Sequence, residues 1–299
     1  MVLLIIDEQT GEWKQITKEE KSAMPKEQQD KTLYLDGFLK KKLDFAMKQQ
    51  RNDNDVVGLV CGAEGSGKST LAGNMMRYIT KDKFDPIKDM VGSDYEDGIN
   101  KLKNRDQGGW LMFDEGNVFF LSTEIMKKES RDLHKIFSIF RQKNLFVLIV
   151  LPSFFRLNTY FSLDRSRFLC YTYVKGGKRS YFKYYGDKRK VKLWKEGKPN
   201  HDMKAVKPLF RGRFEPCLLL ENPEYLKFKK ETLEKSLEVA DVKKVPSPVM
   251  VERAYRLKII EQNPDLNSVK LGKILGIPDR TVRDLKYEIK NKQILSVNQ

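Results

Sequence analysis

One eight-residue stretch constrains the fold of this chain more than any other part of the sequence. It reads Gly62-Ala63-Glu64-Gly65-Ser66-Gly67-Lys68-Ser69 and fits the phosphate-loop pattern G-x-x-x-x-G-K-[ST] at every fixed position. The apolar run 56–61 before it predicts a buried strand, and the run 70–78 after it predicts a helix. Because a phosphate loop requires this strand–loop–helix context, the sequence predicts a nucleotide-binding domain.

The positions of this loop have distinct chemical roles. Glycines let backbone N–H groups turn inward around a phosphate chain, and the N-terminus of the following helix adds a favourable dipole. We expect Lys68 to reach the β- and γ-phosphates and the Ser69 hydroxyl to bind Mg²⁺. The expected cofactors are therefore ATP and Mg²⁺. The residues expected to bind the nucleotide are Gly62, Ala63, Glu64, Gly65, Ser66, Gly67, Lys68, Ser69 and Thr70.

A second motif follows further along the chain. The apolar run 110–113 predicts a short buried strand, and it ends directly in Asp114 and Glu115. We expect Asp114 to hold the hydrated Mg²⁺, as the equivalent aspartate does in phosphate-loop enzymes. Glu115 is then placed to act as the general base that polarises an attacking water. The two motifs together predict a site for hydrolysis.

The pattern of the remaining elements predicts an α/β fold. Strands that alternate with helices indicate a three-layer phosphate-loop NTPase fold, with a mostly parallel central sheet and helices on both faces. The strongest strand is 145–151, which is apolar throughout, as expected for a strand covered on both faces. Other expected elements are a hairpin in 1–17, helices at 33–50, 95–104 and 124–143, and a strand at 168–174.

The site motifs also carry a family resemblance. The Asp-Glu pair after a strand resembles the additional-strand, catalytic-glutamate division of phosphate-loop NTPases. The stretch Phe140-Arg141-Gln142-Lys143-Asn144, followed by the strand 147–151 and Pro152-Ser153, resembles the HerA/FtsK superfamily. Within it, the chain is similar to the zonular-occludens-toxin-like ATPases of phages and mobile elements. The resemblance extends over roughly residues 50–185.

This resemblance implies further site residues. Arg141 matches the arginine that ends a helix in the superfamily, and Ser153 takes the place of the γ-phosphate sensor, where Thr or Gln is usual. In oligomeric members an arginine of one subunit reaches the neighbour's γ-phosphate and stabilises the transition state. Arg141, Arg165 and Arg167 are the candidates for that role. The resemblance therefore implies a homo-oligomer, such as a hexameric ring.

Charge points to a polyanionic partner. The net charge is +16, and residues 175–213 contain fourteen Lys and Arg against three Asp and Glu. Two alternating runs around 186–188 predict a basic hairpin with its turn there. Its aromatic residues suit base stacking on nucleic acid, which the concentrated charge favours over the alternative that they form the hairpin core. They are Tyr181, Phe182, Tyr184, Tyr185 and Trp194.

The last fifty residues predict a separate helical unit of the helix-turn-helix type. We expect helices at 249–262, 268–275 and 279–291, with Asp279 as an N-cap. The expected core residues are Leu271, Ile274, Ile277, Val282 and Leu285. The residues expected to face DNA are Arg280, Thr281, Arg283, Lys286 and Lys290. A three-helix unit can also dock proteins, so that alternative stays open.

The sequence thus predicts an N-terminal extension (1–31), a phosphate-loop ATPase domain (32–215), a helical linker (216–246) and a DNA-binding domain (247–299). Three scattered cysteines and the lack of an apolar span predict a cytoplasmic protein without a zinc site. The favoured function is a Mg²⁺-dependent ATPase that translocates or packages DNA of a virus or mobile element. The alternative is an ATP-switched DNA-binding regulator or replication initiator. A small-molecule kinase fits poorly, because it needs neither Glu115 nor a helix-turn-helix.

Overall fold

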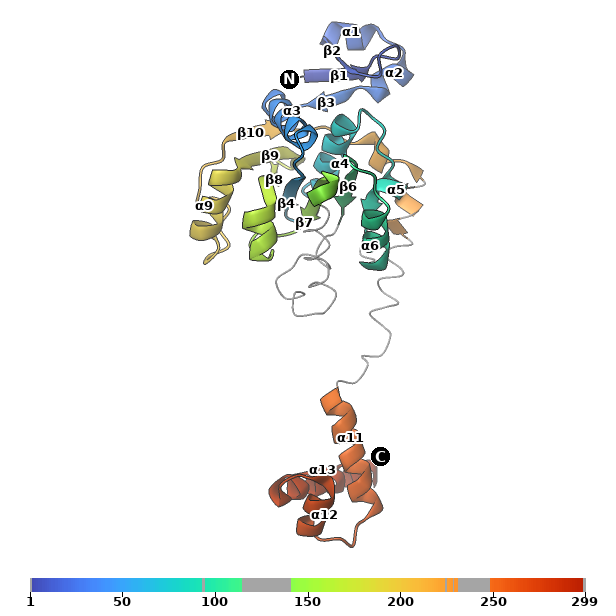
Figure 1. Ribbon diagram of the computed structural model, residues 1–299, viewed down its shortest axis with the longest axis vertical. Helices are drawn as coiled ribbons and strands as arrows, with labels where there is room; N and C mark the ends of the chain where they lie inside the picture. Colours follow the sequence, from blue (N-terminus) through green and yellow to red (C-terminus); the bar gives the residue numbers. More distant parts are fainter. Residues whose placement is uncertain are drawn as a thin grey trace. The chain divides into compact units, whose positions relative to one another are not determined.

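The computed structural model describes residues 2–92, 95–114, 141–223, 225–227, 229–230 and 248–297. The chain divides into two compact units, Met1–Leu237 and Glu238–Gln299 (Figure 1). Glu115 and nearly all of the helix expected at 124–143 lie outside the described residues. Of the described helices, none has the length and apolar character needed to cross a membrane.

The larger unit is built on a seven-stranded sheet in the order β10-β9-β8-β4-β7-β6-β5. Strands β5, β6, β7, β4 and β8 run parallel, and β9 pairs antiparallel with both β8 and β10. The strands are β4 (Val56–Gly62), β5 (Met90–Val91), β6 (Trp110–Phe113), β7 (Phe146–Leu151), β8 (Ser166–Lys175), β9 (Lys178–Gly186) and β10 (Phe210–Arg213). The predicted α/β fold with a mostly parallel central sheet is therefore confirmed.

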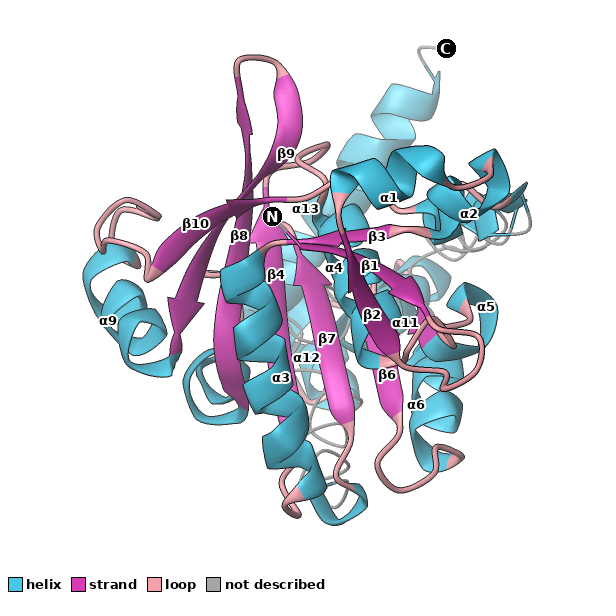
Figure 2. Ribbon diagram, turned by 90° about the horizontal axis from the view of Figure 1, so that it is seen from above, coloured by secondary structure: helices cyan, strands magenta, loops and turns pink. Residues whose placement is uncertain are grey.

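Helices cover both faces of this sheet, which makes the fold three-layered (Figure 2). Alternate residues of β4 enter two separate cores, because successive side chains of a strand point to opposite faces. Val56 and Val60 pack with α3 (Gly37–Arg51) and α4 (Lys68–Ile79). Val57 and Leu59 pack instead with α6 (Tyr95–Lys103) and α9 (Asp187–Gly197).

A small second sheet precedes the large one. The predicted N-terminal hairpin is confirmed as β1 (Val2–Ile6) and β2 (Trp13–Ile16), and β3 (Leu33–Leu35) adds a third strand beside β1. Helix α3 consequently begins at Gly37 rather than at Leu33, and Asp36 caps it by accepting two backbone N–H bonds. Between the strands lie α1 (Lys18–Ala23) and α2 (Lys26–Lys31). The Trp13 indole donates to Tyr78 O at 2.9 Å and joins this sheet to α4.

The basic hairpin turns at a different place from the one predicted. Strands β8 and β9 are joined at Gly176 and Gly177, which both have positive φ, whereas the predicted turn at 186–188 is the start of α9. A Gly-Gly pair suits the tight turn between two antiparallel strands. Four of the aromatic residues expected to stack on nucleic acid are buried instead. They are Phe182, Tyr184, Tyr185 and Trp194.

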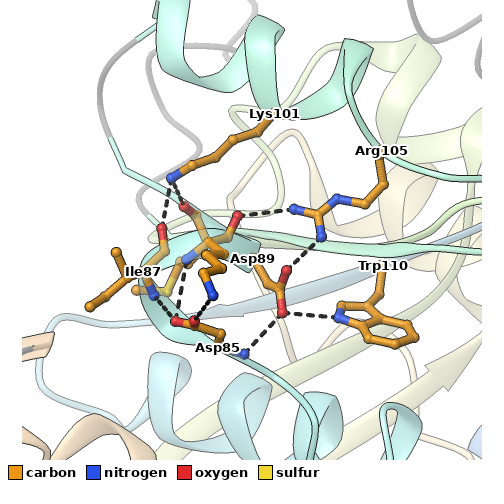
Figure 3. Close-up of polar contacts among 8 residues, drawn as sticks. Asp85, Ile87, Asp89, Lys101, Arg105 and Trp110 are labelled. Carbon is orange, nitrogen blue, oxygen red and sulfur yellow. Dashed lines mark hydrogen bonds and ion pairs between the residues drawn. The ribbon is translucent and has the colours of Figure 1, made fainter.

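A buried carboxylate fixes the edge of the sheet that leads to Asp114. Asp89, at the end of α5 (Pro86–Asp89), accepts hydrogen bonds from the Trp110 indole at 3.1 Å and from the Asp85 N–H at 2.9 Å. Arg105 forms an ion pair with it at 2.5 Å, and Lys101 donates to Met90 O at 2.7 Å (Figure 3). Because Trp110 begins β6, these bonds hold the strand that ends beside the candidate site.

The smaller unit contains α11 (Pro248–Gln262), α12 (Ser268–Leu275) and α13 (Asp279–Val297). Its core is formed by Ile260, Leu271, Val282 and Leu285, with Ile277 packed against them. Ile274, also expected in the core, is 62% exposed and is not part of this core. Asp279 was expected as the N-cap but is the first residue of α13, where its carboxylate pairs with Arg283.

Lys190 is a buried lysine of α9 that lies beside the first residue of β8 in the larger unit. Its side chain is fully buried and Nζ donates to Ser166 Oγ at 2.8 Å, to Ser166 O and to Leu163 O. Asp187 lies 3.3 Å away as an ion-pair partner. Burial, the largest cause, lowers the pKa of Lys190 to about 8 from an ordinary value of 10.5. These contacts tie α9 to the start of β8.

The lowered pKa predicts a pH dependence of stability. The unfolded chain binds more protons than the folded chain between the two pKa values, so the Lys190 contribution to the free energy of unfolding rises with pH there. From pH ~7.5 to ~9.5, wild type should gain about 2 kcal/mol relative to Lys190→Met. Urea denaturation of both proteins at several pH values measures this difference. Parallel pH profiles would contradict it.

Candidate active site

The phosphate loop joins the last residue of β4 to the first turn of α4. Gly67 precedes α4 with φ 88°, a left-handed conformation that favours glycine. At Gly62, an added Cβ would collide with the side chains of Ser66 and Thr172. The motif glycines are therefore needed for backbone conformation and for close packing.

Buried hydroxyls hold the loop in place. The Ser66 and Thr172 hydroxyl oxygens lie 2.7 Å apart, and they also contact Ala63 O at 2.7 Å and Cys61 O at 3.2 Å respectively. Both side chains are almost completely buried, so these bonds are shielded from water. Burial raises the pKa of the Cys61 thiol, which keeps this side chain uncharged behind the loop. The loop is thus anchored to β8 as well as to its own strand.

The two residues predicted to bind Mg²⁺ meet at the mouth of the loop. Ser69 Oγ donates to Asp114 Oδ1 at 2.7 Å, although the two residues come from α4 and from the end of β6. Asp114 is only 5% exposed, and its N–H donates to Val91 O at 2.9 Å. Lys68 Nζ donates to Ala63 O at 3.0 Å and so lies over the same loop.

A cavity of about 690 Å³ opens beside these residues. The end of β7 forms one wall through Leu151 and Pro152. Ser153, the expected γ-phosphate sensor, follows directly and is half-buried, but it does not line the cavity. The residues of the loop and the metal site that line it are Glu64, Gly65, Gly67, Lys68, Ser69, Thr70 and Asp114.

A segment that the sequence assigned to a linker forms the opposite wall. The Tyr225 hydroxyl donates to Asp114 Oδ2 at 3.5 Å, and Lys229 Nζ lies 3.6 Å from the same oxygen. The Asn74 amide of α4 donates to Glu215 O at 2.7 Å, and Leu220 packs close to Gly73. Helical spacing places Tyr225 and Lys229 on one face, but no local pattern connects that face with Asp114.

The three candidate arginines lie at the opposite edge of the sheet. Arg165 forms a largely buried ion pair with Asp55, which precedes the first residue of β4. Arg167 lies at the start of β8, and Arg141 precedes β7 in the short helical segment Arg141–Lys143. Because β4 has seven residues, this edge is ~20 Å from the phosphate loop of the same chain.

The residues expected to face DNA lie on α13. Arg280 and Arg283 are exposed, and Thr281 is half-buried. Arg283 Nη2 lies 2.7 Å from Asp279 Oδ2, and Lys286 Nζ donates to Leu266 O at 2.7 Å. Lys286 therefore also stabilises the turn between α11 and α12. The side chain of Lys290 lies outside the described residues.

The likeness of this chain to known proteins is weak. No protein-family model matches the chain, and no curated protein matches it. Among solved structures, the chain is similar to the N-terminal domain of zonular occludens toxin from Neisseria meningitidis, with a TM-score of 0.35 and 13% identity. The alignment covers 56% of this chain and 98% of that domain. Both the TM-score and the sequence identity are low.

The buried hydroxyl contacts predict a stability effect. Thr172→Val keeps the side-chain shape but removes the partner of Ser66, which should lower the free energy of unfolding by ~1–3 kcal/mol. The loop is then less preorganised, so nucleotide affinity should also fall, by ~2–10-fold. Urea denaturation and titration with a fluorescent ATP analogue measure the two effects.

Thr159→Val is the matched control, because Thr159 is exposed and its side chain forms no capping bond. It should change stability by less than ~0.5 kcal/mol. Equal stability and affinity in Thr172→Val and wild type would show that the Ser66–Thr172 contact does not hold the loop.

Proposed function

We propose that this protein is a Mg²⁺-dependent ATPase that acts on DNA. The observation that carries the proposal is the 2.7 Å contact between Ser69 and Asp114 beside Lys68, at a cavity of about 690 Å³. These are the three side chains that a phosphate-loop ATPase uses to hold Mg²⁺ and the β- and γ-phosphates. A hydroxyl and a carboxylate are also the hard oxygen ligands that Mg²⁺ prefers.

Each residue has a distinct part in the proposed reaction. Ser69 and Asp114 would hold Mg²⁺, which when bound would supply positive charge that stabilises the phosphates. Lys68 places its ammonium over the loop, where the β- and γ-phosphates would lie. Glu115 directly follows Asp114 in the sequence and is the general base for the attacking water. Ser153, one residue beyond the cavity wall, is the sensor of the γ-phosphate.

The strand order supports the proposed division of phosphate-loop proteins. Strand β4, which carries the loop, does not pair with β6, which ends at Asp114, because β7 lies between them. An inserted strand at this place is what the name of the additional-strand division describes. The arrangement favours hydrolysis with Glu115 as base over phosphoryl transfer to a small molecule.

DNA is the proposed partner because cations are concentrated in two places. Residues 175–213 carry the largest local excess of positive charge, and Arg280 and Arg283 are exposed on α13. Cationic side chains of this kind neutralise phosphates and release counterions. Translocation or packaging of the DNA of a virus or mobile element is the favoured process. The three free, buried cysteines fit a reducing compartment such as the cytoplasm.

An oligomer would complete the proposed site. Arg141, Arg165 and Arg167 lie on the edge of the sheet away from their own phosphate loop, so they can reach a nucleotide only in a neighbouring subunit. A ring, such as a hexamer, brings the edge of one subunit to the loop of the next. For Arg165, this requires that the subunit contact releases it from Asp55.

One observation favours a second candidate function. The segment that leads toward the C-terminal unit contacts the metal-site carboxylate through Tyr225 and Lys229. Mg²⁺ bound at Asp114 would compete with Tyr225 and Lys229 for the same carboxylate. The protein could therefore be an ATP-switched DNA-binding regulator or replication initiator, in which nucleotide occupancy matters more than turnover.

Two substitutions test the ATPase. Lys68→Ala should abolish nucleotide binding or turnover, because it removes the cation that holds the phosphates. Glu115→Gln should keep nucleotide binding and lower turnover by at least ~10²-fold, because the general base is lost. Phosphate release and binding of a fluorescent ATP analogue are measured with and without single- and double-stranded DNA.

Lys83→Ala and Glu27→Gln are matched controls, because both residues are exposed and lie outside the site. Normal turnover in Glu115→Gln would refute the role of Glu115. Wild-type turnover without any response to DNA would favour the switch over the motor.

A third set of variants tests DNA binding by the C-terminal unit within the full chain. Replacing Arg280 or Arg283 by Ala should cost ~1–3 kcal/mol of discrimination between duplex sequences if the arginine reads a guanine edge. Lys286→Ala should weaken all sequences alike and reduce the salt slope by about one. Titration of selected and random duplexes at two salt concentrations separates these effects, with exposed Lys258→Ala as the control. Unchanged duplex affinity in every variant would identify the unit as a protein-docking bundle.

A further inference from the structure

Six side chains form two parallel rows across β8, β9 and β10. Directly paired residues make up each row, and the two rows are two residues apart along the strands, so all six share one face of the sheet. We refer to these residues as the aromatic–cationic ladder. The first row is Tyr171, Lys183 and Arg211, and the second is Tyr173, Tyr181 and Arg213.

The ladder is open to solvent, unlike the aromatic residues on the other face. Its three tyrosines and Lys183 are half-buried, and both arginines are exposed. The rings of Tyr173 and Tyr181 stack with centroids 5.7 Å apart, and the Arg213 guanidinium lies 5.2 Å from the Tyr181 centroid. Phe182 and Tyr184, the neighbours in sequence, are buried in the core under α3 and α4.

Positive charge gathers beside these rings without matching carboxylates. A cavity of about 540 Å³ is lined by Lys175, Lys183, Lys204 and Arg211, with Asp202 as its one acidic residue. Among the ion pairs of the described residues, none involves Lys183, Lys204 or Arg211. Asp202 Oδ1 instead accepts the backbone N–H of Lys204 at 2.7 Å.

Lys183 lies in the middle of this cluster. Its Nζ is 5.7 Å from the centroids of both Tyr171 and Tyr173, near the outer limit of a cation–π contact. Burial first, and then the charges of Arg211 and Lys204, lower its pKa, while Asp202 acts in the opposite direction. A bound phosphate would give Lys183 the counter-charge that the protein does not place there.

We propose that the aromatic–cationic ladder binds single-stranded nucleic acid, with bases stacked on the tyrosines and phosphates held by Lys183, Lys204 and Arg211. Stacking platforms beside a basic groove are the usual means of binding single strands. The two rows are ~7 Å apart, since each residue of a strand advances ~3.3 Å. Bases of a duplex follow one another at ~3.4 Å, so two neighbouring bases can each occupy a row only when the strand is unstacked.

The position of the ladder deepens the proposed function. Thr172 lies between Tyr171 and Tyr173 in the sequence, and its side chain contacts Ser66 of the phosphate loop on the opposite face of β8. Figure 2 shows the β8–β9 hairpin projecting beyond the neighbouring strands. Strand β8 therefore contacts the phosphate loop on one face and contributes two tyrosines to the ladder on the other. This coupling rests on the proposed ATPase, whereas binding of single strands by the ladder does not.

Fluorescence anisotropy with a labelled oligo-dT and the full chain, without nucleotide or Mg²⁺, tests the ladder. Tyr173→Ala should weaken binding by ~5–150-fold, the loss of one stacked base, whereas Tyr173→Phe should bind as wild type because the ring is kept. Arg211→Gln should reduce the slope of log affinity against log salt by ~0.7, the effect of one phosphate contact on a single strand. Lys188→Gln, an exposed lysine of α9, removes the same charge away from the ladder and should leave the slope unchanged.

Two outcomes would overturn the proposal. One is wild-type affinity for oligo-dT in both Tyr173→Ala and Arg211→Gln. The other is an equal change of slope in Arg211→Gln and Lys188→Gln, which would indicate general attraction to net charge. Hydrolysis of ATP by wild type is measured separately, both with and without single- and double-stranded DNA. Binding through the ladder without hydrolysis would refute only the ATPase, and hydrolysis with ladder-independent binding would refute only the ladder.

Discussion

The hydrogen bond between Ser69 and Asp114 is the contact on which the rest of the site depends. It joins the first turn of α4, the helix that follows β4, to the end of β6, although β4 and β6 do not pair in the sheet. The contact forms only because parallel strands end at one edge, so that residues far apart in sequence converge there. Asp114 is nearly buried, which strengthens its interactions with Ser69 and with any cation held between them. The order of the strands thus brings one hydroxyl beside one carboxylate.

The parts of this fold that the sequence predicted well have local causes. The phosphate loop, β6 and α12 depend on short-range chemistry, namely glycines at a tight turn, continuous apolar runs and a helix ended by Gly276. The incorrect predictions concern residues whose secondary structure or burial is determined by tertiary contacts. Leu33–Leu35 continues smoothly into a helical pattern, and it becomes a strand because β1 lies alongside. Ile274 has the spacing of a core residue, yet the packing of the three helices leaves it outside their core and exposed.

The sequence predicted only those residues of the candidate site that belong to a recognisable motif. Lys68, Ser69 and Asp114 were identified because a chemical pattern marks each of them. Tyr225 and Lys229 carry no such mark, since their role comes from a chain segment that returns to the sheet after β10. The sequence did not predict the aromatic–cationic ladder, for a related reason. Its members pair only through the register of β8 with β9 and β10, and a hairpin turn placed ten residues away gives a different register.

Alternation along β8 explains how one strand can serve two purposes. Cys170 and Thr172 point toward the core and the phosphate loop, so their size and polarity are fixed by packing and by Ser66. Tyr171 and Tyr173 point to the other face, where the packing under α9 gives way to solvent. Because side chains one residue apart share a backbone but no contacts, the two faces can differ completely in chemistry. A displacement of the loop that moves Thr172 must nevertheless move the peptide units on either side of it. The backbone of β8 therefore connects the Ser66–Thr172 hydrogen bond at the phosphate loop directly to Tyr171 and Tyr173 of the ladder.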